Sequence, residues 1–590
     1  MTLLLGLIVL FVGWLAPGHF LPWINFQNEV AAAAGGLLLG VSACVVAKQE
    51  QGVLWPTSAA VVLALTLVVV AQFATGQIRY LSDGVLAVVY LAAFAAAIVA
   101  GATLTRSSER QQFVAGLFAV LLAAGIASTG LAATQWLELG PIGFVEMIRP
   151  GDRPGANLVQ ANHLSTLLCL ALMSALWFFE TRRINGATLA IAASWLAIGL
   201  VMTRSRTSWV FLILLCVLWV SMRSRVESRL SPRALAAAIG LFILGVLVWG
   251  PLSQTLAVHV PVSVADRIQG GTARLGMWKA ILAGLLESPW VGYGWTQVSR
   301  AALEGSIAQH TGEHMLRNSH SLLLDLLVWN GIPLGALIIG LIGWWLVRAV
   351  RACRDAGYLV ALLALCAILT HALFEYPLEY MYFLIPAGLL VGHLDTLASM
   401  KKQTWRAPTF TLALPVAALT AMMLWISVEY LRVHQASDDG LMLAAGYARK
   451  AELPDVVLLD GPREYIRFWR TQAGPNMTDE QLQWMRNVVG RNPSPPALLR
   501  LAMATGLNGR PEEARETLVR LCNMHVAPRC EEGRRSWSAV QEHTAALRAI
   551  PFPATPAVTR HLTPAPPAAT SRTGPVGPWA AGAASVPIAQ

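Results

Sequence analysis

A histidine at the start of an apolar run is the residue of this chain best placed for chemistry. His320 follows Arg317 and Asn318 where a long polar loop meets the apolar run 321–347. Imidazole titrates near neutral pH and can take a proton from a hydroxyl group, while a neighbouring guanidinium can hold an anion. A lone histidine at a helix start is more often a cap or an interfacial residue. Its interpretation therefore depends on what else the fold brings to the same place.

The segment 149–163, which reads RPGDRPGANLVQANH, leads into another apolar run. Near its end, Gln160, Asn162 and His163 offer neutral donors and acceptors that suit sugar hydroxyls or pyrophosphate oxygens. For Asn162, capping of the helix that follows is the alternative.

Two arginines share a tight turn, TRSRTS at 203–208, between two apolar runs. Arg204 and Arg206 are costly so close to lipid unless they are paired, and the turn itself contains no acidic residue. A lipid-linked diphosphate would complete the pairing, because the guanidinium fork matches phosphate oxygens. The alternative is that both side chains reach lipid headgroups.

Two further pairs of residues are spaced four apart, which places each pair on one helix face. Arg274 and Trp278 belong to a predicted amphipathic helix, 272–287, at the membrane surface; basic helices of this kind often only bind membrane. His371 and Glu375 close another apolar run. The glutamate could orient the imidazole, anchor an arginine, or form a purely structural ion pair.

The composition predicts a polytopic all-α membrane protein as the frame for these residues. The 590 residues are 55% hydrophobic and 13% charged, and the mean hydropathy is +0.55. About thirteen apolar runs are long enough to cross a bilayer core of roughly 30 Å. They begin near Thr2, Val30, Thr57, Val85, Phe113, Leu164, Gly186, Ser208, Ala234, Ser321, Tyr358, Tyr380 and Thr409.

The basic residues between the runs predict the orientation of the chain. They follow even-numbered runs, at Lys48, Arg106, Arg110, Arg182, Arg183, Arg223, Arg225, Arg229, Arg233, Arg348, Arg351, Arg354, Lys401, Lys402 and Arg406. By the positive-inside rule these loops are cytoplasmic, so the polar segments described above face the other side, which is the periplasm in a Gram-negative cell. The net charge of +10 is thereby explained by topology rather than by nucleic-acid binding. The first run lacks a charged n-region, and we interpret it as a retained anchor.

Three regions are predicted along the chain. A membrane domain covers residues 1–430 and includes a polar loop at 251–318, while 431–550 has the composition of a soluble helical, tetratricopeptide-like domain. The Pro- and Ala-rich stretch 551–590 is predicted to be disordered. Cys522 and Cys530 could form a disulfide if this part is periplasmic, although spacing alone does not establish one. No CxxC or HExxH metal-ligand spacing occurs in the sequence.

Several motifs together resemble the Wzy/WaaL/PglL superfamily of bacterial lipid-linked glycan polymerases, ligases and O-oligosaccharyltransferases. They are QANH at 160–163, SRTS at 205–208, RLGMWKAIL and SPWVGYGW within 274–295, and NSHSLLLDLLVWNGIPLG at 318–335. The stretch HALFEYPLEYMYFL at 371–384 and the additional C-terminal domain look more like the protein-glycosylating PglL branch.

The resemblance implies a GT-C-like glycosyltransferase of the inner membrane. It would take an oligosaccharide from undecaprenyl diphosphate on the periplasmic face and pass it to Ser or Thr of a periplasmic or pilin-like protein. The chain lacks an Asp-x-Asp pattern, so we expect metal-independent, inverting transfer without a cofactor. His320 would be the general base. The expected substrate-binding residues are Gln160, Asn162, His163, Arg204, Arg206, Arg274, Arg317, Asn318, His371, Glu375 and Tyr376.

Two other functions stay open on the sequence. An O-antigen ligase or polymerase would share these motifs and use lipid A core or another glycan as acceptor. A polytopic transporter or flippase would need ionisable residues near the middle of its spans and a detectable internal repeat, and the apolar runs contain few such residues. The glycan, the acceptor site, the oligomeric state and the role of 431–550 are not encoded in any motif that we find.

Overall fold

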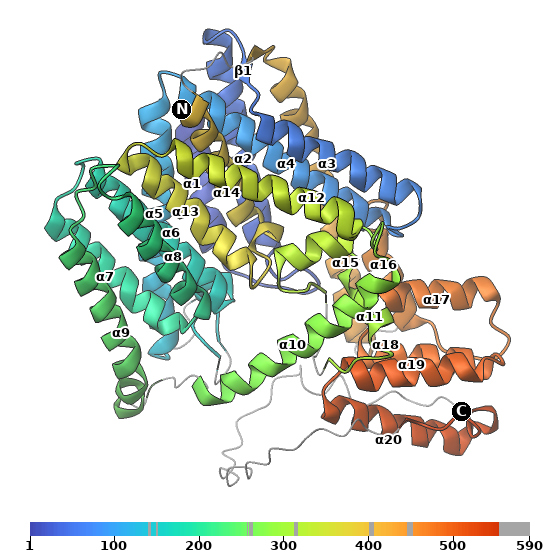
Figure 1. The fold of residues 1–590 in the computed structure, drawn as a ribbon. Helices are drawn as coiled ribbons and strands as arrows, with labels where there is room; N and C mark the ends of the chain where they lie inside the picture. Colours follow the sequence, from blue (N-terminus) through green and yellow to red (C-terminus); the bar gives the residue numbers. More distant parts are fainter. Residues whose placement is uncertain are drawn as a thin grey trace.

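The computed structural model describes residues 1–139, 143–148, 152–256, 258, 264–311, 317–399, 406–444 and 452–553. This part of the chain is almost entirely helical (Figure 1). Within it, the strands are β1 (Val53–Leu54) and β2 (Arg406–Ala407), an antiparallel pair in which Val53 lies opposite Ala407. The predicted all-α class is therefore confirmed.

Ten of the described helices are long and apolar enough to cross a bilayer. They are α2 (Phe26–Gln49), α3 (Thr57–Ala74), α4 (Leu81–Arg106), α5 (Arg110–Trp136), α6 (Ala161–Glu180), α7 (Gly186–Thr203), α9 (Pro232–Thr255), α12 (Leu322–Ala352), α14 (Met381–Ser399) and α15 (Phe410–Ala444). Three shorter apolar helices are α1 (Thr2–Leu15), α8 (Arg206–Met222) and α13 (Ala356–Ala372). Each predicted apolar run coincides with one of these helices, so the chain is a multi-pass membrane protein.

Helices α6 and α14 form the centre of the bundle. In their most apolar stretches 78% and 83% of the residues are buried, compared with 11% in α9, which lies at the edge (Figure 1). Helix α14 packs directly on α4 because of Gly101 and Gly392. A Cβ on Gly101 would lie 2.4 Å from a backbone oxygen of α14, and a Cβ on Gly392 would lie 2.0 Å from a backbone oxygen of α4. Small residues allow membrane helices to approach this closely, and α14 is thereby packed into the core.

The predicted polar loop 251–318 contains two helices, α10 (Val264–Glu287) and α11 (Val298–Gly305), and residues 257, 259–263 and 312–316 of it lie outside the described part. The helix predicted at 272–287 is present and begins earlier, at Val264. Met277 and Ile281 are buried on one side of α10, while Leu282 and Leu286 are exposed on the other. Its position at the membrane surface stays a prediction.

Helix α12 breaks at Gly331, within the GIPLG motif, and then continues to Ala352. Gly331 has a φ of 74°, in the left-handed region that favours glycine. Backbone hydrogen bonds join Tyr293 N to Val328 O at 2.8 Å and Ile332 N to Pro289 O at 2.7 Å across this break. The two motifs SPWVGYGW and LVWNGIPLG therefore contact each other, at the end of the helical segment that begins at Leu322, two residues after His320.

The C-terminal helices are α16 (Asp460–Arg470), α17 (Asp479–Arg491), α18 (Pro495–Leu507), α19 (Pro511–Met524) and α20 (Ala527–His543). Three 3₁₀ turns complete the fold, η1 (Ala156–Leu158), η2 (Pro377–Glu379) and η3 (Ala545–Leu547). Helices α18 and α19 match the predicted helical pair, and a disulfide joins Cys522 to Cys530. Helix α15 continues past residue 430 to Ala444. Of the stretch 551–590 that is predicted to be disordered, all but residues 551–553 lies outside the described residues.

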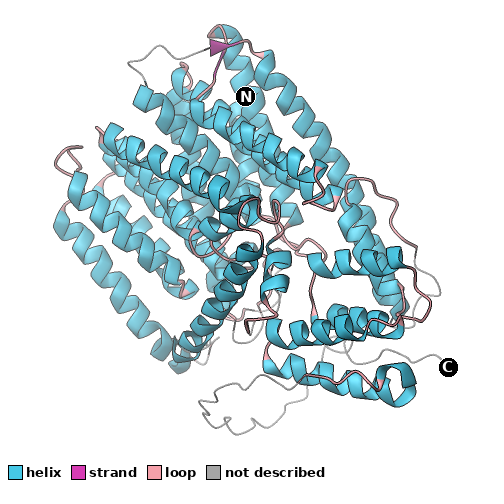
Figure 2. Cartoon of the chain, turned by 45° about the vertical axis from the view of Figure 1, so that its right-hand side comes forward, coloured by secondary structure: helices cyan, strands magenta, loops and turns pink. Residues whose placement is uncertain are grey.

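The C-terminal helices gather at one end of the molecule (Figure 2). They dock on the start of α4. The Asp460 carboxylate accepts hydrogen bonds from the backbone N–H groups of Leu81 and Ser82 at 2.9 and 2.8 Å, and so caps α4 from another element. Beside it, the buried Asp83 forms an ion pair with Arg491 at 2.8 Å. These contacts hold the C-terminal helices at the end of the bundle where α6, α12 and α14 also begin.

Candidate active site

The Glu375 side chain is the centre of a polar cluster at this end of the bundle. One of its oxygens, Oε1, accepts hydrogen bonds from Arg274 Nη2 at 2.7 Å and from Asn162 Nδ2 at 3.1 Å. Its other oxygen, Oε2, lies 2.6 Å from Nδ1 of His320. Residues predicted as candidates from three different segments of the chain therefore meet at one carboxylate. That carboxylate is only 8% exposed.

Charge keeps Glu375 ionised. Burial by itself would raise the pKa of its carboxyl, but the hydrogen bond and charge of His320, followed by the charge of Arg274, hold the pKa below its ordinary value of 4.5. Glu375 lies in the turn after α13, which ends at Ala372. It is therefore a permanent anion at neutral pH, placed between an imidazole and a guanidinium.

His320 is held in an unusual backbone conformation. Its φ of 55° lies in the left-handed region, which histidine tolerates better than most residues. The preceding residue is fixed twice, because Trp278 Nε1 donates to Ser319 O at 2.8 Å and Ser319 N donates to Asp325 Oδ1 at 2.9 Å. The imidazole side chain stays 30% exposed. The loop thus directs a partly accessible ring onto Glu375.

Asn162 connects Glu375 to the turn between α7 and α8. Its Oδ1 accepts hydrogen bonds from Ser205 Oγ at 3.0 Å and from Arg153 Nη1 at 3.4 Å. The N-cap position of α6 is Gln160, and neither residue makes a side-chain capping bond there. The capping interpretation of Asn162 is therefore wrong, because its amide is turned toward the site.

Positive charge is concentrated next to this amide. Arg153 donates to the backbone oxygen of Thr203 at 3.2 Å and reaches that of Arg204 at 3.5 Å. Burial lowers the pKa of Arg153, and the charges of Arg206 and Arg274 lower it further against the opposing effect of Glu375. Burial also lowers the pKa of Arg204. The guanidinium groups of Arg153, Arg206 and Arg274, from three segments, therefore lie close enough to influence one another, in a region that attracts anions.

A second carboxylate, Glu379, belongs to the same cluster. Asn318 Nδ2 donates to Glu379 Oε2 at 3.0 Å, while Arg317 is exposed at the edge of the cluster. Burial and the charge of Asp325 raise the pKa of Glu379 to about 7, although Arg317 and the Asn318 hydrogen bond act in the opposite direction. Glu379 therefore changes protonation near neutral pH.

The two other candidate histidines lie beneath the cluster. His371 Nδ1 is 2.8 Å from Thr166 Oγ1 and His163 Nδ1 is 2.9 Å from Tyr382 Oη; both rings are fully buried. Of the alternatives left open for Glu375, the structure has the one in which it anchors an arginine, Arg274, at 2.7 Å; its carboxylate contacts the imidazole of His320, so the pairing with the His371 side chain is wrong. In this conformation neither histidine reaches the accessible surface of the site.

Tyr376 borders the imidazole of His320. Their ring centroids are 5.1 Å apart in an edge-to-face arrangement. Burial raises the pKa of Tyr376, while side-chain hydrogen bonds with Gln160 and Tyr380 act to lower it. Gln160 is thus connected to the cluster through the phenol of Tyr376.

Two residues of the cluster, Arg153 and Glu379, are absent from the sequence-based candidates. Both stand in the segments that supplied candidates, 149–163 and 371–384. Like Arg204, Arg153 is an arginine in a segment that the positive-inside rule places on the non-cytoplasmic side. That pattern was the available signal for it.

Two parts of the chain match known protein families. Residues 188–339 match a family described as O-antigen ligase, and residues 358–531 match the C-terminal part of a virulence factor membrane-bound polymerase. The first part contains Arg204, Arg206, Arg274 and His320, and the second contains Glu375 and Glu379.

The chain is also similar to two proteins of Acinetobacter baylyi. It is 27% identical over 535 residues to a general O-oligosaccharyltransferase, covering 89% of this chain and 92% of that protein. It is 29% identical over 279 residues to a ComP-specific O-oligosaccharyltransferase, covering 45% and 48%. These matches confirm the predicted resemblance to the Wzy/WaaL/PglL superfamily.

Proposed function

We propose that this membrane glycosyltransferase, similar to bacterial O-oligosaccharyltransferases, moves an oligosaccharide from undecaprenyl diphosphate to a Ser or Thr hydroxyl of a periplasmic or pilin-like protein. The observation that carries the proposal is the contact of His320 Nδ1 with Glu375 Oε2 at 2.6 Å, within a group of arginines. An ionised carboxylate beside an imidazole favours the tautomer with the proton on Nδ1. The lone pair is then on Nε2.

In the proposed reaction His320 acts as general base. Its Nε2 takes the proton of the acceptor hydroxyl as that oxygen forms a bond to the anomeric carbon of the donor sugar. The bond from this carbon to the diphosphate oxygen breaks on the opposite face, and its electron pair leaves with the diphosphate. Displacement in one step inverts the anomeric configuration. Glu375 stabilises the imidazolium that forms, since it is already an anion next to the ring.

Arginines take up the negative charge that develops on the leaving diphosphate. Arg153, Arg206 and Arg274 are close enough for the charges of the last two to lower the pKa of the first, so an anion between them would be favoured. Guanidinium groups bind phosphate oxygens in pairs of parallel hydrogen bonds. In this proposal they perform the role of a divalent cation, and no cofactor is needed.

The orientation of the basic loops supports a site on the periplasmic face of the inner membrane. The C-terminal helices dock at the same end of the bundle through Asp83 and Arg491. We therefore propose that residues 431–550 form a periplasmic domain close to the site, where an acceptor protein would approach.

Reconstituted protein tests this function. The purified chain in lipid nanodiscs is supplied with oligosaccharide on undecaprenyl diphosphate and with a pilin-like protein or lipid A core as acceptor. We expect sugar on the protein acceptor, detected by intact mass spectrometry. Because one matched family is described as O-antigen ligase, transfer to lipid A core alone would replace the protein acceptor in the proposal. Absence of transfer to any acceptor would overturn it.

A further inference from the structure

The segment 318–320 is held by a carboxylate at each of its three residues. Glu379 accepts a hydrogen bond from the first residue at 3.0 Å, and Glu375 lies 2.6 Å from the imidazole of the last. Between them, the backbone N–H of Ser319 donates to Asp325 Oδ1 at 2.9 Å. The mechanism proposed above uses Glu375 and gives Asp325 no part.

Asp325 lies in the first turn of α12, yet its carboxylate reaches back to the loop before that helix. The N-cap residue Ser321 makes no side-chain capping bond, although the first N–H groups of a helix commonly receive one. The Asp325 side chain is 2% exposed and its partner Ser319 is completely buried. An enclosed carboxylate is costly unless its oxygens accept hydrogen bonds. Asp325 therefore ties the start of α12 to the loop that carries His320.

The backbone of His320 needs support of this kind. Its φ of 55° is left-handed, a conformation that a residue other than glycine keeps only where the surrounding contacts over-determine it. Trp278 Nε1 donates at 2.8 Å to the oxygen of the peptide group between Ser319 and His320. Asp325 holds the preceding peptide group through its N–H. Two successive peptide groups are therefore fixed just before the Cα atom of His320.

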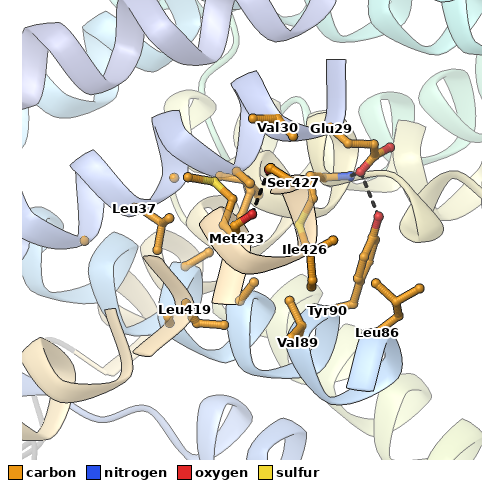
Figure 3. A pocket seen from close by; sticks show the side chains of 18 of the residues that line it. Glu29, Val30, Leu37, Leu86, Val89, Tyr90, Leu419, Met423, Ile426 and Ser427 are labelled. Carbon is orange, nitrogen blue, oxygen red and sulfur yellow. Dashed lines mark hydrogen bonds between the residues drawn. The ribbon is translucent and has the colours of Figure 1, made fainter. Parts of the chain in front are cut away.

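The turn that carries Glu379 is fixed as well. Glu379 lies two residues before Met381, the first residue of α14. The backbone N–H of Met381 donates to Glu29 Oε2 at 2.8 Å, and Tyr90 Oη donates to the same oxygen at 2.9 Å (Figure 3). Glu29 belongs to α2 and Tyr90 to α4. The hydrogen bond from Asn318 to Glu379 therefore connects the loop to the membrane helices, while Asp325 supports it from α12.

We propose that Asp325 is a positioning residue for His320. By accepting the N–H of Ser319 it keeps the imidazole against Glu375, with Nε2 directed to the acceptor hydroxyl. The inference rests on the proposed function for the role of His320 as general base. It adds that a buried side chain of α12, which touches no substrate, sets this base in place. Asp325 should then affect the rate of transfer only through His320.

Removal of the acceptor oxygen tests this role. We expect Asp325→Leu to lower kcat by about 10–10²-fold, since a small misplacement of a catalytic group costs that much, with KM for the lipid-linked donor within about twofold of wild type. Asp325→Asn should keep kcat within about threefold of wild type, because its amide oxygen can still accept the bond. Wild-type kcat in Asp325→Leu, or no recovery by asparagine, would overturn the inference.

Two comparisons separate positioning from a general loss of stability. Asp355 caps α13 by accepting a hydrogen bond from Tyr358 N at 2.8 Å, a contact of the same kind outside the cluster. The matched control Asp355→Leu should lower the unfolding temperature and leave kcat unchanged; an equal fall of kcat in this control would contradict a specific role of Asp325. In His320→Ala, which lacks the imidazole, Asp325→Leu should have no further effect on transfer. A further fall would show that Asp325 acts by another route.

Hydrogen exchange separates this inference from the proposed function. Exchange at the Ser319 amide, measured at single-residue resolution on the full chain in nanodiscs, requires no transfer. It should be about tenfold or more faster in Asp325→Leu than in wild type and in Asp325→Asn, because an amide without its acceptor is less protected. Equal exchange in the three proteins contradicts the inference. Absence of transfer by wild type, with the Ser319 amide protected as expected, contradicts only the proposed function.

Discussion

His320 and Glu375 stand 55 residues apart in the sequence and meet through Nδ1 and Oε2 at 2.6 Å. The contact joins the loop before α12 to the turn after α13. His320 has a left-handed backbone at this point, and Glu375 lies in the turn just after α13 ends at Ala372. The contact therefore joins a partly exposed imidazole to a buried carboxylate.

Replacement of the imidazole should abolish most of the transfer. We expect His320→Ala to lower kcat by about 10²–10⁴-fold, the usual contribution of a general base. Retention of the lipid-linked donor should be unchanged, because the arginines are intact. Single-turnover transfer in nanodiscs measures the first effect and native mass spectrometry the second. Wild-type kcat in this variant would exclude the role of His320 as base.

The charge of Glu375 should stabilise the fold in a pH-dependent way. Its pKa is below the ordinary value of 4.5, so its contribution is fully present above about pH 4.5 and is lost as the pH falls further. We expect Glu375→Gln to lower the free energy of unfolding by about 1–3 kcal/mol at pH 7. The difference from wild type should shrink only below about pH 4.5. Thermal unfolding in detergent between pH 8 and pH 4 measures it, and a constant difference would contradict the ionised state.

Arg153 should matter for the donor, although the sequence did not single it out. Its guanidinium contacts Asn162 and the backbone of Thr203, within the group of positive charges. We expect Arg153→Ala to lower kcat/KM for the lipid-linked donor by roughly 10²-fold. Arg153→Lys should recover only part of the loss, because an ammonium lacks the planar fork. Full recovery by lysine would mean that charge alone is required.

The break in α12 should require glycine. A Cβ at Gly331 would lie 2.4 Å from Trp290 O, at a φ of 74°. We expect Gly331→Ala to lower the unfolding temperature and to reduce transfer, because the break is where the helical segment that follows His320 packs on the loop 289–293. Gly340→Ala in the same helix is the control, since a Cβ there meets nothing within 4 Å. That control should be neutral or slightly stabilising. Equal behaviour of the two variants in thermal unfolding and transfer assays would contradict this account.

The membrane helices and the pair α18–α19 could be predicted from sequence, because apolar length and helical spacing are local properties. The contacts of Glu375 could not. Asn162 is 213 residues away from it, and nothing in a local pattern specifies that pairing. The pairing of His371 with Glu375 was predicted from helical spacing, and the backbone N–H of Glu375 does donate to His371 O at 2.9 Å, but the Glu375 carboxylate is directed to His320 and Arg274, which come from distant segments. Arg153 was missed because its partners are backbone oxygens of a distant turn.

The ion pair between Asp83 and Arg491 should be what fixes the C-terminal helices to the membrane domain. Both side chains are mostly enclosed, at 8% and 18% exposed, and Gln297 Nε2 also donates to Asp83 at 3.2 Å. Removal of one partner from a buried pair leaves the other charge unpaired, at a cost of about 3–5 kcal/mol. We expect Arg491→Met and Asp83→Leu each to increase hydrogen exchange in α16–α17 and at the start of α4.

The double variant Asp83→Leu with Arg491→Met distinguishes a true pair from two independent contacts. It buries no unpaired charge, so its exchange rates should lie closer to wild type than those of either single variant. Additive effects would instead mean that the two side chains act separately. Gln297 directly precedes α11, which packs on α10. Loosening of this pair should therefore also displace Arg274 and Trp278 on α10, and so lower the rate of glycan transfer. Normal transfer in the single variants would show that the docking of the C-terminal helices is not needed to position the site.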